Sequence, residues 1–107
     1  MGHVVHNGQR FEWDDTKRRR VLREHGVDLE RLPRMFNGPI IEDFDAAHSD
    51  SEDRWRIIGM LDDRCIVAVY TRRNAAIRLI TARPAEPHEE TEFEIMLIGE
   101  ALPDDPT

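Results

Sequence analysis

The chain has 107 residues, of which 39% are hydrophobic and 35% charged, and its formal net charge is −7. A chain of this length can bury one core, so we expect a single small domain over residues 1–107. One cysteine, Cys65, excludes a disulfide framework, and no apolar run reaches the ~18 residues that a membrane span needs. Because the N-terminus also lacks a signal-peptide pattern, we expect a cytoplasmic protein without a membrane partner.

The negative charge is concentrated near the end of the chain. Residues 84–107 carry eight acidic side chains and no Lys or Arg, so all 15 basic residues lie in residues 1–83, against 14 acidic ones. The local field around a basic patch steers a polyanion more than the total charge does. The net charge therefore leaves a nucleic-acid partner open.

The N-terminal part predicts a strand and a first helix. Residues 1–9 are expected to be mobile, and residues 11–93 are expected to form the folded core. Phe11-Glu12-Trp13 reads as a short aromatic strand. Residues 15–24 follow as a helix that Gly26 ends in the left-handed conformation.

A second helix is predicted over residues 28–36. Its apolar residues recur at helical spacing, namely Leu29, Leu32, Met35 and Phe36. Pro33 conflicts with a helix interior because it has no N–H group. Asn37-Gly38-Pro39 then stops the element, and residues 40–44 read as a short strand.

The second half predicts an antiparallel meander and a last helix. Residues 54–61, 65–71 and 76–83 are apolar runs separated by short turns. A Glu-rich helix begins at His88, and residues 101–107 read as a disordered tail. One face of this helix can dock on the sheet or on a partner, through Phe93, Met96 and Leu97.

Two arginines in residues 76–83 are the most informative charges. Period-two alternation puts Arg78 on the face opposite Ile77 and Leu79. A guanidinium cannot lose its proton, so inside a sheet it needs an anion or water. Arg78 and Arg83 therefore either close internal ion pairs or line a cleft that takes a polyanion.

Short motifs run through residues 11–93. In chain order they are Phe11-Glu12-Trp13-Asp14 with Lys17; His25-Gly26-Val27; Phe36-Asn37-Gly38-Pro39; Asp45 and His48-Ser49 with Glu52 and Arg54; Ile58-Gly59; Val69-Tyr70; and Ile77-Arg78-Leu79-Ile80-Thr81-Ala82-Arg83 followed by Ala85 and Glu89. In this order and spacing they resemble the BrnT toxins of bacterial type II toxin–antitoxin systems. Glu90-Thr91-Glu92 departs from the family, which usually has a basic stretch there.

The resemblance implies an α+β, RelE-like fold, with two N-terminal helices packed on an antiparallel sheet and a C-terminal helix. It also implies a ribonuclease that halts translation. The implied partner is a small antitoxin that dimerises through a ribbon-helix-helix domain and represses its own operon. Operator DNA would then be bound only through the antitoxin.

Metal-free RNA cleavage needs a base for the 2′-hydroxyl proton, an acid for the leaving oxygen and cations for the phosphorane. His25 and His48 are the candidates for proton transfer, because only histidine titrates near neutrality unperturbed. Arg78 and Arg83 are candidate phosphate clamps, because a guanidinium offers a fork of donors. Since no Asp/Glu/His cluster has convincing ligand spacing, we predict neither a metal nor another cofactor.

Four more residues are candidates for RNA binding. Trp13 either stacks a base or belongs to the core. Lys17 and Arg54 add positive charge. Glu52 either orients a histidine or an arginine, or pairs with Arg54 two residues along the same strand face. Similarly, His25 is either catalytic or a plain helix end, and His48 either catalytic or plain surface.

Three hypotheses follow. The first is a metal-independent endoribonuclease toxin that its antitoxin neutralises. The alternative is a catalytically weak or inactive module of the toxin fold that acts as antitoxin partner and operon co-repressor. The third is a structural domain unrelated to toxin systems. Independently, the acidic C-terminal segment is predicted to fold against basic patches of the body through Glu89, Glu90 and Glu92, as an internal polyanion mimic.

Overall fold

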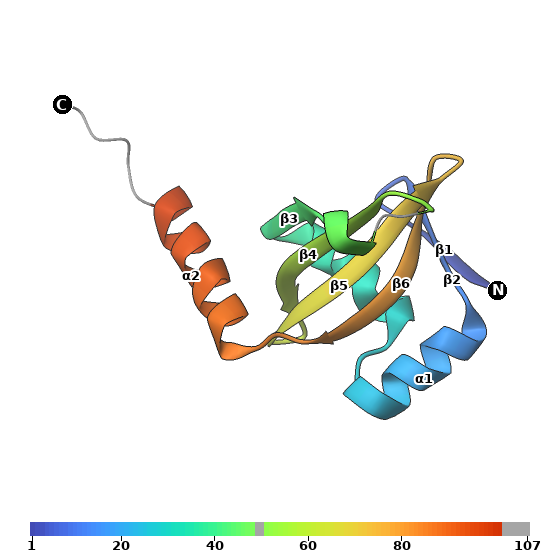
Figure 1. Cartoon of the computed structure of the whole chain (residues 1–107), viewed down its shortest axis with the longest axis horizontal. Coiled ribbons are helices and arrows are strands. Elements are labelled where there is room, and N and C mark those ends of the chain that lie inside the picture. Colours follow the sequence, from blue (N-terminus) through green and yellow to red (C-terminus); the bar gives the residue numbers. More distant parts are fainter. Residues whose placement is uncertain (49–50, 102–107) are drawn as a thin grey trace.

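The computed structural model describes residues 1–48 and 51–101, and these build one six-stranded mixed sheet (Figure 1). The strand order is β1-β2-β6-β5-β4-β3, and only β2 and β6 run parallel. The strands are β1 (Gly2–His6), β2 (Gln9–Trp13), β3 (Ile40–Phe44), β4 (Arg54–Leu61), β5 (Arg64–Arg73) and β6 (Ala76–Pro84). The predicted meander is confirmed as β4, β5 and β6.

The two α-helices, α1 (Asp15–His25) and α2 (Pro87–Ala101), lie at opposite ends of the sheet (Figure 1). The 3₁₀ segment η1 (Leu29–Asn37) packs on one face of the sheet, and a second, η2 (Ala46–His48), follows β3. The first predicted helix is confirmed, and Gly26 ends it as predicted. A carboxylate oxygen of Asp14 accepts from the backbone N–H of Lys17 at 3.0 Å. Gly26 has φ 67° and donates its N–H to the Leu22 carbonyl.

The predicted fold class is wrong beyond its general α+β character. The expected architecture, RelE-like with two N-terminal helices on an antiparallel sheet, has one of those helices replaced by η1. Pro33 lies inside η1 and removes a backbone donor, so the segment forms successive 3₁₀ turns. The sheet is mixed because β6 pairs in parallel with β2, which the pattern of each strand alone does not reveal.

The N-terminal end also differs from the expectation of a mobile segment over residues 1–9. Gly2–His6 forms the edge strand β1, which pairs antiparallel with β2. Asn7 and Gly8 join the two strands, and both have positive φ. Positive φ at both loop residues is the type I′ geometry that matches the twist of paired strands. At the other end of the chain, the tail predicted over residues 101–107 lies outside the described residues after Ala101.

The sheet buries apolar side chains on both faces. On one face, α1 and η1 contribute to the larger core, which also holds aromatic residues of the sheet. Its fully buried large members include Phe11, Leu29, Leu32, Met35, Ile57, Ile66, Tyr70 and Leu79. A smaller cluster at one end of the opposite face joins Phe93 of α2 to Ile58 and Val67. The predicted C-terminal helix is confirmed, and its predicted apolar face docks on the sheet: Phe93 is buried there, and Met96 and Leu97 pack against the same cluster.

An irregularity between Val69 and Tyr70 decides where the arginines of β6 point. Val69 pairs with Thr81 and Tyr70 pairs with Leu79, so Ile80 is an extra residue in β6. Such a bulge breaks the strict alternation of faces. Ala82 consequently joins the larger core, whereas Arg83 turns to the opposite face. In the part of the chain that is described, no helix is long and apolar enough to cross a membrane.

Candidate active site

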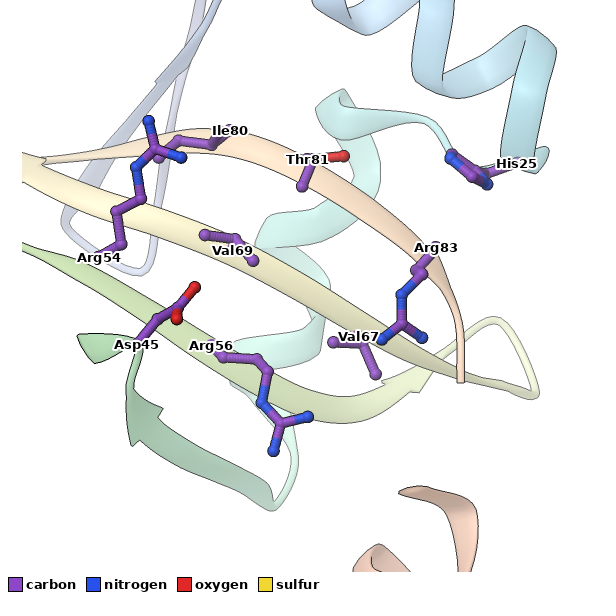
Figure 2. Close-up of a pocket in the computed structure, with 9 residues that line it drawn as sticks. All are labelled: His25, Asp45, Arg54, Arg56, Val67, Val69, Ile80, Thr81 and Arg83. Atoms are coloured by element: carbon purple, nitrogen blue, oxygen red, sulfur yellow. The ribbon is translucent and has the colours of Figure 1, made fainter. Parts of the chain in front are cut away.

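A hollow of about 310 Å³ lies on the sheet face opposite η1, over β4, β5 and β6. Figure 2 shows the side chains around it, and we call it the arginine hollow. Its lining residues are His25, Asp45, Arg54, Arg56, Val67, Val69, Ile80, Thr81 and Arg83. Valine and isoleucine side chains form an apolar floor, and charged side chains stand around it. A partly apolar floor lowers the local dielectric, which strengthens the pull of these guanidinium groups on an anion.

One buried carboxylate holds two of the three arginines. Arg83 donates from Nη1 to Oε1 of Glu89 at 2.7 Å and from Nη2 to Oε2 at 2.9 Å. Arg56 donates from Nη1 to the same Oε2 at 3.0 Å. The backbone N–H of Glu86 adds a fourth donor to Oε1 at 2.8 Å. Glu89 stands in the first turn of α2, where a negative charge is favoured by the helix dipole.

These contacts set the ionisation of the cluster. The Glu89 side chain is only 3% exposed, and burial alone would raise the pKa of a carboxyl group. The hydrogen bonds from Arg83 outweigh burial and lower the pKa of Glu89 to about 2, with further help from the Glu86 N–H and from Arg56. The same pairing raises the pKa of Arg83 above its ordinary value. At neutral pH all three side chains are therefore charged.

Acid should weaken the fold through this cluster. Because the pKa of Glu89 is lower in the folded state than the 4.5 of a free Glu, its contribution to stability is complete above about pH 4.5. That contribution is lost as the pH falls from there toward 2. We expect this contribution to the free energy of unfolding to be on the order of 2 kcal/mol, because solvent screening at the two partly exposed arginines reduces it. Urea unfolding of wild type and Glu89→Gln at pH 6 and pH 3 measures it: the pH dependence should shrink in the variant and stay unchanged in Glu90→Gln. An equal pH dependence in all three proteins would contradict this assignment.

Three of the predicted site residues come together in the hollow. They are Arg83 of β6, Arg54 of β4 and His25, the last residue of α1. His48 is the last residue of η2, which follows Asp45 directly, and its side chain lies outside what is described.

The other predicted residues do not line the hollow. Arg78 of β6 lies 3.5 Å from Glu12 and forms an ion pair there. Trp13 is 3% exposed and belongs to the larger core, and Lys17 stands in the first turn of α1. Glu52 accepts hydrogen bonds from Arg73 and lies 4.0 Å from Arg54.

Sequence reasoning did not propose Arg56 for the site and named Asp45 only as part of a motif. Arg56 alternates with Arg54 on β4, so period two places both on one face. The sequence therefore predicts that the two arginines share a face of the sheet, but it does not predict which face. Asp45 reaches the hollow because its backbone N–H bonds to the Arg54 carbonyl at 2.8 Å, which holds the end of β3 against β4.

One group near the hollow has the donor types of a metal site. Ligand atoms of Glu86, His88 and Glu89 lie within 4.8 Å of one another. Glu89 already neutralises two guanidinium groups, whose positive charge opposes a cation at the same carboxylate. We therefore assign no metal to this group.

A comparison with known families finds one model that matches the chain. Its description is "Ribonuclease toxin, BrnT, of type II toxin-antitoxin system", and the match covers residues 13–89. These residues make up more than half of the chain and include the lining of the arginine hollow together with Glu89. No curated protein matches the chain.

Proposed function

Since the chain belongs to the BrnT family of ribonuclease toxins of type II toxin–antitoxin systems, we propose that it is an endoribonuclease toxin that cleaves RNA at the arginine hollow and thereby inhibits translation. One observation carries the placement of the site. Three arginines and one histidine line a single hollow of a sheet face. Arginine suits phosphate through its fork of donors, and histidine suits proton transfer near neutral pH.

The proposed reaction draws its cations and one of its two proton-transfer groups from the hollow. The 2′-hydroxyl oxygen of one nucleotide attacks the neighbouring phosphorus and forms a 2′,3′-cyclic phosphate. The bond from phosphorus to the 5′-oxygen breaks, the 2′-hydroxyl proton goes to a base, and the leaving 5′-oxygen takes a proton from an acid. Arg83, Arg56 and Arg54 stabilise the negative charge on the phosphorane, so no metal ion is required. His25 performs one of the two proton transfers.

The proposed partner is an antitoxin, as expected for a type II system. From the family resemblance we propose that the antitoxin dimerises through a ribbon-helix-helix domain. We also propose that the toxin–antitoxin complex binds operator DNA only through the antitoxin. On α1, Arg19 and Arg20 are exposed, whereas Lys17 and Arg18 are half-buried and Arg18 pairs with Asp28. The exposed basic face of α1, together with the hollow, is the surface that we propose the antitoxin covers. Because translated RNA is found in the cytoplasm, we propose that the toxin acts there.

One feature favours a second candidate, a catalytically weak module that serves as antitoxin partner and co-repressor. Glu89 occupies donors of Arg83 and Arg56 that a phosphate would otherwise use. The predicted contact of the acidic segment with the body is thus confirmed for Glu89, while Glu90 and Glu92 are exposed. In the second candidate this contact would silence the site permanently.

A cleavage assay on purified protein separates the two candidates. Wild type should cut a single-stranded RNA, with the same rate in the presence of EDTA. His25→Ala should lower kcat by about 10²-fold or more, because loss of a general acid or base costs that much. RNA affinity should change little, since the group acts in the transition state.

His48→Ala is the matched comparison, and only one of the two histidine variants should show the large loss. Wild type that binds the antitoxin but cuts no RNA would support the co-repressor. Cleavage that EDTA abolishes would contradict the metal-free scheme. Each variant is first checked by circular dichroism for a wild-type fold.

A further inference from the structure

We propose that Glu89 is a positioning residue, which holds Arg83 and Arg56 in one fixed arrangement for the RNA phosphate, and that docking of α2 thereby completes the site. The inference rests on the proposed ribonuclease function and assigns a role to a residue that touches the arginines and not the RNA. Four donors meet on its two oxygens within 3.0 Å, including both Nη atoms of Arg83. The two guanidinium groups are therefore fixed relative to each other.

The exposure of the three side chains indicates which of them are accessible to RNA. Glu89 is 3% exposed, whereas Arg83 and Arg56 are 39% and 32% exposed. The Glu89 carboxylate is therefore closed off from solvent, whereas part of each arginine side chain remains accessible. Both arginines line the hollow, and Glu89 does not. A carboxylate placed behind the guanidinium groups orients them without filling the space where a phosphate would bind.

Donors remain for a phosphate after Glu89 is satisfied. A guanidinium carries five N–H groups. The bonds from Arg83 to Glu89 use one N–H on Nη1 and one on Nη2, and Nη1 also donates to the Pro84 carbonyl at 3.2 Å. These acceptors leave the Nε–H group and the second N–H of Nη2 for a phosphate. Without the carboxylate, each arginine would have to lose its rotamer freedom when the RNA binds. Fixing the groups beforehand makes their charge available to the transition state without reorganisation.

The attachment of α2 controls this arrangement. Glu89 reaches the arginines only because α2 begins at Pro87, next to the end of β6 (Figure 1). Farther along the helix, Phe93 is 3% exposed and packs against Ile58 and Val67 of the sheet. The ion pairs at Glu89 and the packing of Phe93 thus hold the same helix on the same sheet. A substitution that weakens the packing of Phe93 should therefore make Arg83 and Arg56 more mobile without changing any charge.

The test compares Glu89→Gln with Glu90→Gln, which removes the same charge from an exposed neighbour on α2. Three quantities are measured: kcat and KM on an RNA oligonucleotide, affinity for the same oligonucleotide with 2′-O-methyl groups, which cannot be cut, and ¹⁵N relaxation of the arginine Nε–H groups. In Glu89→Gln we expect kcat to fall about 10²-fold, as for a misplaced catalytic group. Affinity should stay equal or increase, and Arg83 should become mobile. Glu89→Asp, which keeps the charge, should restore part of kcat.

Each other result has a defined meaning. If Glu89→Gln raises both kcat and affinity, Glu89 is a competitor of the phosphate and the positioning role is wrong. If kcat stays at the Glu90→Gln level, or Arg83 remains rigid, the role is wrong as well. If Glu89→Gln does not fold, Phe93→Leu, which trims the contact of α2, must lower kcat with Arg83 mobile, and an unchanged kcat would overturn the proposal. Wild type that cuts no RNA would contradict the proposed function, and the relaxation data would still decide whether Glu89 fixes the arginines.

Discussion

Replacing Arg83 with alanine is expected to lower the rate of RNA cleavage by about 10²-fold or more, the scale seen when one preorganised donor is lost from a site. Arg83 is the arginine that the bulge in β6 turns into the hollow, and its guanidinium is fixed by two hydrogen bonds. Binding of uncut RNA should weaken less than the rate falls, because the phosphorane carries more negative charge than the ground state. Single-turnover kinetics and binding of 2′-O-methyl RNA measure the two effects separately.

Arg78→Ala is the matched control for that experiment. Arg78 lies on the same strand, but it pairs with Glu12 and does not line the hollow, so its removal should leave cleavage near the wild-type rate. Arg83→Lys keeps the charge and loses the fork, and should recover only part of the rate. If folded Arg83→Ala cuts RNA normally, the pair with Glu89 is purely structural and the hollow is not the active site.

The bulge in β6 also shows which features of the sheet can be predicted from the sequence and which cannot. Runs of apolar residues and turn residues located β4, β5 and β6 within two residues of their ends, because strand periodicity is a local property. The face on which Arg83 lies is not local. Strict alternation would place Arg83 with Ile77 and Leu79 in the core, and only the extra Ile80 reverses it. No residue type in β6 predicts the bulge.

Glu89, which binds Arg83 and Arg56, illustrates the same limit. The family resemblance included Glu89 in the motif that ends with Arg83 and set Glu90 and Glu92 apart as departures, but it gave Glu89 no role, and charge alone could not supply one. What distinguishes it is burial against Arg83 and Arg56, two side chains from different strands. These partners, far apart in the chain, come together because β5 pairs with both β4 and β6, an arrangement that exists only in the folded sheet.

Leu32→Ala is expected to have the largest effect on stability, about 2–5 kcal/mol. Leu32 lies in η1, is fully buried, and packs in the larger core under the sheet. The sequence selected this residue correctly as apolar face of a helix, although the backbone around it is 3₁₀. Alanine removes the buried side-chain atoms and leaves a cavity that a short, Pro33-stiffened segment cannot close easily.

Leu22→Ala tests whether burial is the cause. Leu22 stands on α1 with 46% of its surface exposed, so the same truncation should change the free energy of unfolding by no more than about 0.5 kcal/mol. Urea unfolding at neutral pH measures both variants. Domains of this kind are stable by roughly 5–15 kcal/mol, so the Leu32 variant should lose a large share of its folded population on mild heating. Equal effects of the two substitutions would mean that η1 does not anchor the core, and that the sheet holds the arginine hollow in place without it.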